Sequence, residues 1–299
     1  MGRAARRAAA LGVMAFVVLG VLGVGRLPSA SAVGNQASST KAYQATIASD
    51  SAVIVATYSL TYRGGKRSFS MTTMGPFSWS QDRGDFSVNV VGSGSTITTE
   101  EIVDGNETYS ATSTTGLPAG DNSSAGWTET TWRGHGAGGG LNFFDLFFGY
   151  VPGSGTNPKA ILALLRGRAT SEERMGRAVL NGVDTSRFRS SIPFSSLGVT
   201  GASTAQIERA VGSKALMVDY WTDSSDRLRL MRFSLKIAHP PKLKTTHPGS
   251  GLSAALVPIT ESVQLQLSDY GTYVNVTPPP PNEITSRTTC EVTTSGFSC

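Results

Sequence analysis

The side chains that perform nucleophilic or metal chemistry are scarce in this chain of 299 residues. It has three histidines, His135, His239 and His247, and two cysteines, Cys290 and Cys299. A serine nucleophile requires a histidine base and an orienting acid. No G-x-S-x-G segment offers the sharp turn on which many hydrolases carry their serine. We therefore expect no catalytic residues and no enzymatic activity.

The spacing of the potential ligands also argues against a metal site. His239 and His247 lie in a segment rich in Pro and Lys, with no acid or cysteine close by in the sequence. Asp219, Asp223 and Asp226 lack the ligand order of a calcium-binding loop, and a solvated turn between two strands explains them. We expect no metal and no cofactor.

An aromatic segment is the most apolar part of the chain beyond its N-terminal region. Phe143, Phe144, Phe147 and Phe148 fall at i, i+1, i+4 and i+5, which is a broad helical stripe. Glycines on both sides would let the segment move as a lid. Three interpretations stay open: the rings line a cavity for an apolar ligand, they are core beneath a sheet, or they form an exposed patch that docks on a membrane or a protein.

The positive charge of the chain is concentrated at its start. The formal net charge is +5, but Arg3, Arg6, Arg7 and Arg26 lie within the first 32 residues, which hold no acids. Without these four, 22 basic residues face 21 acidic ones. No Lys/Arg cluster remains to contact phosphates, so we exclude nucleic acid as a partner.

The first 32 residues have the order of a secretory signal peptide. A cationic start precedes an apolar stretch at 11–25, and Ala30-Ser31-Ala32 offers a small-x-small cleavage site. The apolar stretch is short for a spanning helix, which needs about 20 residues; a retained N-terminal anchor is the alternative. No cysteine near the cleavage site could accept a lipid. We expect an exported protein, secreted or associated with the cell envelope, and not lipidated.

The two cysteines lie at the C-terminal end. In an exported protein, a disulfide between Cys290 and Cys299 is the natural interpretation. It would close a small loop within a C-terminal tail, 282–299. The alternative is a pair of free thiols.

Alternation of apolar and polar residues predicts many antiparallel strands. Asp104-Gly105-Asn106 and Asn181-Gly182 are strong hairpin signals between them. The expected strands are 52–62, 67–74, 86–91, 97–103, 107–112, 173–180, 183–192, 215–222, 227–237 and 257–268. Short helices are expected at 41–49, 159–166 and 204–211. Strands in series with a few helices clustered in mid-chain indicate an α+β domain.

The mid-chain helix has a clear start and an unusually apolar surface. Asn157 is placed as its N-cap and Pro158 as its first residue. Its apolar residues cover more than half of the circumference, so it is expected to be covered on most sides. They are Ile161, Leu162, Leu164 and Leu165.

Four segments in order resemble one family. They are the helix at 157–165, the strand at 182–189, the hairpin at 218–231 and the terminal segment at 268–279, which contains Tyr270-Gly271 and Pro278-Pro279. Together they are similar to the LolA-like family of actinobacterial envelope proteins, which includes the LppX and LprG type lipid carriers. The resemblance covers roughly 41–281.

This resemblance implies a fold and a function. The fold is a strongly curved antiparallel sheet, an incomplete β-barrel, with short helices plugging its concave face, here over a domain at 33–281. Family members hold a lipid or acyl chain in a cavity between sheet and helices and are not known as catalysts. The residues expected to line such a cavity are Phe143, Phe144, Phe147, Phe148, Tyr150, Ile161, Leu162 and Leu165.

Two departures leave a second function open. Close family members are lipoproteins, whereas this chain has no lipidation cysteine, and its insert at 133–150 is longer than expected. The alternative is a structural or regulatory envelope protein, whose core is filled by its own side chains and whose surface binds a protein partner.

Overall fold

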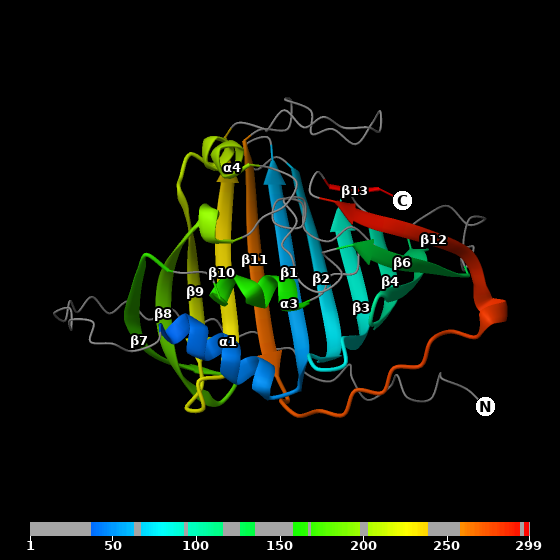
Figure 1. Ribbon diagram of the computed structural model, residues 1–299, viewed down its shortest axis with the longest axis horizontal. Helices are drawn as coiled ribbons and strands as arrows, with labels where there is room; N and C mark the ends of the chain where they lie inside the picture. The colour runs from blue at the N-terminus through cyan, green and yellow to red at the C-terminus, as the bar shows by residue number, and fades with distance from the viewer. Residues whose placement is uncertain are drawn as a thin grey trace. The chain divides into compact units, whose positions relative to one another are not determined.

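One large sheet dominates the computed structural model (Figure 1). The structure describes residues 37–62, 67–92, 95–115, 126–134, 158–166, 169–197, 203–238, 258–293 and 296–298. Its 13 strands follow the order β13-β12-β6-β5-β4-β3-β2-β1-β11-β10-β9-β8-β7, with β13 and β7 as the two edges. All pairs are antiparallel except β12 with β6. The protein is therefore mostly β, which corrects the expected α+β class.

The elements have the following bounds. The strands are β1 (Ser51–Tyr62), β2 (Arg67–Ser78), β3 (Arg83–Gly92), β4 (Ser95–Asp104), β5 (Glu107–Thr115), β6 (Trp127–Gly134), β7 (Ser171–Leu180), β8 (Val183–Pro193), β9 (Ala215–Thr222), β10 (Leu228–Ile237), β11 (Ile259–Ser268), β12 (Ile284–Thr293) and β13 (Gly296–Ser298). The helices are α1 (Ser38–Ala48), α3 (Pro158–Leu162), η2 (Ala163–Arg166), η3 (Phe194–Ser196), α4 (Thr204–Val211) and η5 (Pro281–Glu283).

Alternating burial explains why the central strands form. In β11, every second residue is buried, namely Ile259, Glu261, Val263, Leu265 and Leu267, while the residues between them are partly or fully exposed. This period of two gives the sheet one core-facing side. The tight turns between strands use residues that tolerate positive φ, such as Asn181 at 49°.

Short helices cover the core-facing side. Figure 1 shows α1 and α3 crossing in front of the strands, and α4 at one end of the sheet. Helix α4 has a full capping box between Ser203 and Gln206, and it ends at Gly212 with φ of 73°. The sequence prediction of this helix is confirmed. The mid-chain helix is also confirmed, although its second half tightens into the 3-10 turn η2.

The C-terminal segment returns to the far edge of the sheet. After β11, in the middle of the sheet, the chain runs through an extended stretch to β12, which pairs with β6 (Figure 1). This connection has to be long because β1 to β6 lie between β11 and β12 in the sheet. On the way, Val276 packs on Ile102, Tyr109 and Trp127, on the side away from the helices. The predicted tail, 282–299, thus carries β12 and β13 of the same sheet.

Several expectations concern residues outside this description. Every described residue lies within Gln36–Cys299. The predicted signal peptide, 1–32, lies outside the described residues. So do Cys299 and all three histidines. Among the described residues, no helix is long and apolar enough to cross a membrane.

Candidate functional site

The core-facing side of the sheet is apolar over its central strands. Cross-strand neighbours form a continuous row in which Tyr58 of β1 lies beside Val263 of β11, and Val263 beside Phe233 of β10. All three are at most 7% exposed. Such rows of apolar pairs stabilise a sheet and present a smooth apolar surface to whatever lies above it.

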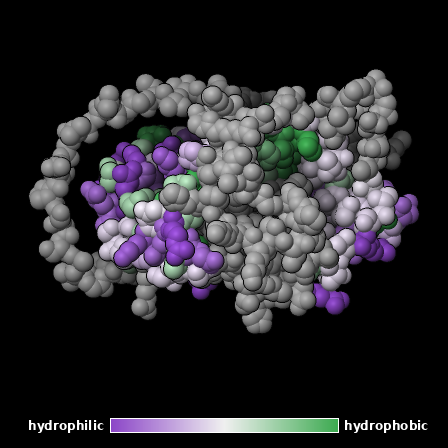
Figure 2. All heavy atoms as spheres, turned by 90° about the horizontal axis from the view of Figure 1, so that it is seen from above, coloured by the Kyte–Doolittle hydropathy of each residue, from purple (hydrophilic) through white to green (hydrophobic). Residues whose placement is uncertain are grey.

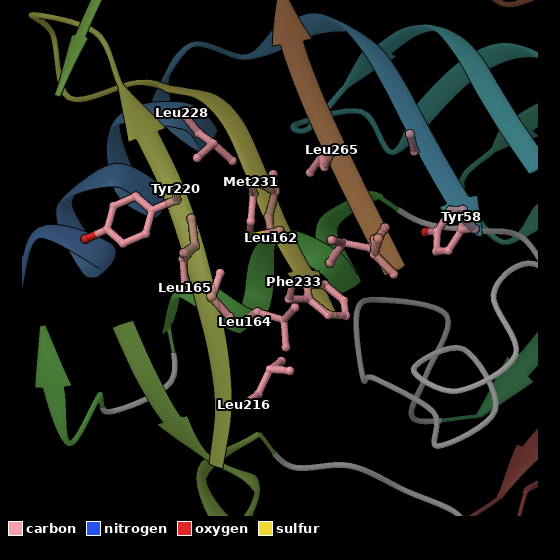
Figure 3. Close-up of a cluster of buried hydrophobic side chains, with 14 of the residues drawn as sticks. Tyr58, Leu162, Leu164, Leu165, Leu216, Tyr220, Leu228, Met231, Phe233 and Leu265 are labelled. Atoms are coloured by element: carbon pink, nitrogen blue, oxygen red, sulfur yellow. The ribbon is translucent and has the colours of Figure 1, made fainter. Parts of the chain in front are cut away.

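Three of the residues expected to line a cavity lie on this surface. Ile161, Leu162 and Leu165 belong to α3 and η2, are 7%, 0% and 0% exposed, and share one cluster with the strand residues. Figure 3 shows Leu162 and Leu165 in the layer that also holds Met231 and Phe233. The other expected lining residues, Phe143, Phe144, Phe147, Phe148 and Tyr150, lie outside the described residues.

A carboxylate on the edge strand β7 anchors helix α1 over this surface. Glu172 accepts hydrogen bonds from the backbone N–H groups of Ser38 at 2.8 Å and Ser39 at 3.0 Å, the first residues of α1. Ala37, which precedes the helix, has no side chain that could cap it. Glu172 therefore supplies the cap from 134 residues away, and its charge complements the positive end of the helix.

The same carboxylate also binds two hydroxyls of the sheet. Tyr220 donates to it at 2.7 Å and Ser190 at 3.1 Å. Burial alone would raise the pKa of Glu172, but the hydrogen bonds from Tyr220 and Ser38 outweigh it, and the pKa is lowered. Burial and the negative charge of Glu172 raise the pKa of Tyr220 far above its usual range. This pair stays Glu⁻ with TyrOH at neutral pH.

A second glutamate on the core-facing side is placed very differently. Glu261 of β11 is 1% exposed and stands between Leu60 of β1 and Leu235 of β10. Within the part of the chain that the structure describes, neither of its carboxyl oxygens has a hydrogen-bond partner. Burial raises the pKa of Glu261 well above its usual range, which favours the uncharged acid, with one O–H donor and one carbonyl acceptor.

The position of Glu261 is near one end of the central strands. It lies two residues from Ile259, where β11 begins, and its row is close to Tyr62 and Ile237, where β1 and β10 end. Helix α4 reaches the same end, because the N–H of Ala238 donates to the carbonyl of Ala210. The acid therefore lies at the rim of the apolar surface rather than at its centre.

The core-facing side of β3–β6 has a different character. Val88 of β3 lies beside Thr99 of β4, and Val103 of β4 lies beside Thr108 of β5. Thr99 and Thr108 are 0% and 2% exposed, and Thr99 shares a hydrogen bond with Thr112. This part of the core-facing side is thus mixed: buried apolar side chains lie beside buried hydroxyls and beside the buried carboxyl of Glu101.

Sequence reasoning missed both glutamates for different reasons. Glu261 occupies an inward position in a strict alternation, Ile259, Glu261, Val263, Leu265, and this break in the pattern was a readable signal. Glu172 gave no local signal, since its partners on α1 and β9 are remote in sequence. Among the described residues, no group of three or more His, Cys, Asp or Glu is placed to hold a metal ion.

Comparison with known proteins gives distant likenesses of fold. No protein-family profile and no curated protein matches the chain. It is similar to the crystal structure of LprF from Mycobacterium bovis, with TM-score 0.40 and 15% identity over 81% of this chain and 95% of that chain. It is also similar to the lipoprotein LppX of Mycobacterium tuberculosis, with TM-score 0.39 and 16% identity over 80% of this chain and 96% of that one.

A more remote likeness is to a putative outer membrane lipoprotein-sorting protein domain from Vibrio parahaemolyticus, with TM-score 0.23 and 9% identity over 77% of this chain and 92% of that one. LppX is one of the carriers that the sequence resembles, and the similarity seen here is one of fold. At these TM-scores, the function has to be judged from the residues of this chain.

Proposed function

We propose that this protein is an exported, unlipidated binding protein of the cell envelope that shelters a lipid acyl chain against the apolar surface of its central strands. The observation that carries the proposal is Glu261, a buried carboxyl that stands between two leucines and has no hydrogen-bond partner among the described residues. The sheet alone gives this side chain no role.

The energetics explain why a ligand is the natural partner of Glu261. Burying a polar group without a hydrogen bond costs about 1–3 kcal/mol on the scale of protein mutations. A leucine or valine at this position would continue the apolar alternation of β11 at no such cost. A ligand that places a hydroxyl, ester or carboxyl group against Glu261 would restore the missing hydrogen bond.

The apolar surface supplies the affinity for the rest of the ligand. Each methylene removed from water contributes about 0.8 kcal/mol, so a long acyl chain lying along the rows of β10, β11, β1 and β2 gains enough for tight binding. We also propose that the sheet is strongly curled, as in an incomplete barrel. Curling would increase the area of the sheet that contacts the acyl chain. The proposed lining residues remain Phe143, Phe144, Phe147, Phe148, Tyr150, Ile161, Leu162 and Leu165.

A second candidate function has its own supporting observation. Leu162, Leu164 and Leu165 are all 0% exposed and pack directly with strand residues. Such packing supports the alternative of an envelope protein whose core is filled by its own side chains and whose surface binds a protein partner. The two candidates differ in whether the protein takes up an apolar molecule.

Titration with a fluorescent polyene fatty acid tests the proposal. We expect saturable binding with a negative change in heat capacity, the mark of apolar burial. Replacing Glu261 with Leu should weaken binding about tenfold, because the carboxyl group of the probe loses its hydrogen-bond partner. The control is Gln264→Leu, which adds an apolar side chain to the opposite face of the same strand and should leave binding unchanged. Absence of saturable binding to the wild-type protein would favour the filled core.

A further inference from the structure

A cluster of arginines surrounds a buried tryptophan on the other side of the sheet, away from the helices. Trp221 of β9 follows Tyr220, which faces the core, and Arg232 of β10 lies between the core residues Met231 and Phe233. Trp221 and Arg232 therefore face outward. Figure 2 shows hydrophilic described residues on the left, the side on which Figure 1 shows β7–β10 and α4, and others at the right edge.

Two guanidinium groups contact the ring of Trp221. Arg187, its neighbour on β8, has its guanidinium carbon 5.0 Å from the ring centroid, and Arg232 has its own at 4.5 Å. Trp221 is 3% exposed. The ring is thus held as a platform by cations from the strands on either side.

The carboxylate of Asp219, which carries the negative charge of this cluster, is paired mainly with Arg189 and also with Arg187. Asp219 binds Arg189 through both carboxylate oxygens, at 2.7 and 2.9 Å, and also binds Arg187 at 2.9 Å. Burial would raise the pKa of Asp219, but its hydrogen bonds to Arg189 and Arg187 lower it, so it stays charged. Glu173 lies across from Arg189 on the edge strand and adds its charge on that side.

Positive charge is left unmatched around the ring itself. Among the described residues, Arg232 forms no ion pair, and the Nε of Arg187 is buried without a hydrogen-bond partner. Burial and then the charge of Arg187 lower the pKa of Arg232, and the charge of Asp219 raises it by less. Arg187 and Arg232, both in contact with one ring, are like charges and repel each other. An anion placed between them would relieve this repulsion and accept hydrogen bonds from both guanidinium groups.

A pocket lies near this cluster, although Trp221, Arg187 and Arg232 do not themselves line it. It has a volume of about 250 Å³ and begins at Leu230, the cross-strand neighbour of Trp221. Asn181, Gln266 and Ser268 line it with amide and hydroxyl groups, and Asp269 adds a carboxylate. Arg229 also lines it, but its guanidinium group is paired with Asp223 at 2.8 Å. These groups suit hydroxyls rather than a second anion.

We propose that Arg187 and Arg232 bind a phosphate ester on the outer face of the sheet, next to Trp221, and that the adjacent pocket receives the hydroxylated group that the phosphate carries. A phospholipid headgroup and a soluble sugar or polyol phosphate share this chemistry. This phosphate site lies on the opposite side of the sheet from the proposed apolar face. A test that rules out one of the two sites leaves the other unaffected.

Two binding measurements on the folded wild-type protein separate these sources. One is calorimetric titration with glycerol 3-phosphate. The other is cosedimentation with phosphatidylcholine vesicles with and without phosphatidylglycerol. Binding of glycerol 3-phosphate assigns the site to soluble phosphate esters, and binding only to vesicles with phosphatidylglycerol assigns it to a lipid headgroup. Failure of both overturns the proposal.

A matched pair of variants tests the geometry. Arg232→Gln and Lys236→Gln each remove one positive charge from the outward side of β10, and both residues are exposed. We expect Arg232→Gln to weaken phosphate ester binding about tenfold, the effect of a charged hydrogen bond, and Lys236→Gln to leave it nearly unchanged. If both variants lost phosphate ester binding equally, binding would depend only on net charge, and the proposed site would be wrong. The fluorescence of Trp221 gives a second readout: ligand should shift the wild-type emission and not that of Trp221→Phe.

Discussion

The hydroxyl of Tyr220 on β9 lies 2.7 Å from Oε2 of Glu172 on β7, reaching past the intervening strand β8. Through the same carboxylate, the first two N–H groups of α1 are tied to the sheet. The helix that covers part of the apolar face is thus held by an edge strand, and a single glutamate joins the three elements.

Removing the charge of Glu172 should loosen α1. We expect Glu172→Gln to lower the free energy of unfolding by about 1–2 kcal/mol at neutral pH, because the amide turns an NH₂ group toward donors. Since the pKa of Glu172 is lowered in the folded protein, its contribution is present above the ordinary pKa of about 4.3 and is lost as the pH falls below it. Urea unfolding of both proteins between neutral and acidic pH measures this, and a difference that does not shrink in acid would contradict the assignment.

Glu261 should have the opposite dependence on pH. Its folded pKa is raised, so above about pH 4.3 the unfolded chain releases a proton that the folded chain retains. The advantage in stability of Glu261→Gln over the wild type should therefore grow with pH, by about 1.4 kcal/mol per unit until the folded pKa is reached.

Glu261→Leu should also stabilise the ligand-free protein, by about 1–3 kcal/mol, because the buried polar group is gone. Thermal unfolding of the delipidated proteins at several pH values checks both variants. A destabilised leucine variant would mean that Glu261 has a partner in solution, and the proposed role in ligand binding would lose its basis.

Mutating the phenylalanine stripe distinguishes a role in lining a cavity from a role in the core. We expect Phe144→Asp and Phe147→Asp to abolish uptake of the polyene fatty acid and to leave the sheet folded, as judged by circular dichroism. Charged groups in the path of an acyl chain carry a desolvation cost that the chain cannot offset. Loss of the β signal in these variants would instead identify the stripe as core.

The strands with alternating apolar residues could be predicted from the sequence, and so could α4, because its capping box and glycine stop are local signals. Strands β6 and β12 could not, since their Thr-rich sequences show little alternation and depend on each other across 158 residues, as between Arg287 and Glu129.

The candidate site was predictable in part. The burial of Ile161, Leu162 and Leu165 follows from the apolar surface of their helix, and the inward position of Glu261 follows from the alternation in β11. The anchoring of α1 by Glu172 and the arginine cluster around Trp221 arise only when β7–β10 pair. No short segment contains both members of these contacts.

Native mass spectrometry of the protein, purified from its own cell envelope or medium and combined with lipid extraction, tests the central claim most directly. The account predicts a fraction with one bound molecule of defined mass, which extraction identifies as acylated, and predicts that Glu261→Leu carries much less of it. A clean ligand-free mass in gentle conditions, for wild type and variant alike, would contradict lipid binding and leave the filled core with a protein partner as the function to test.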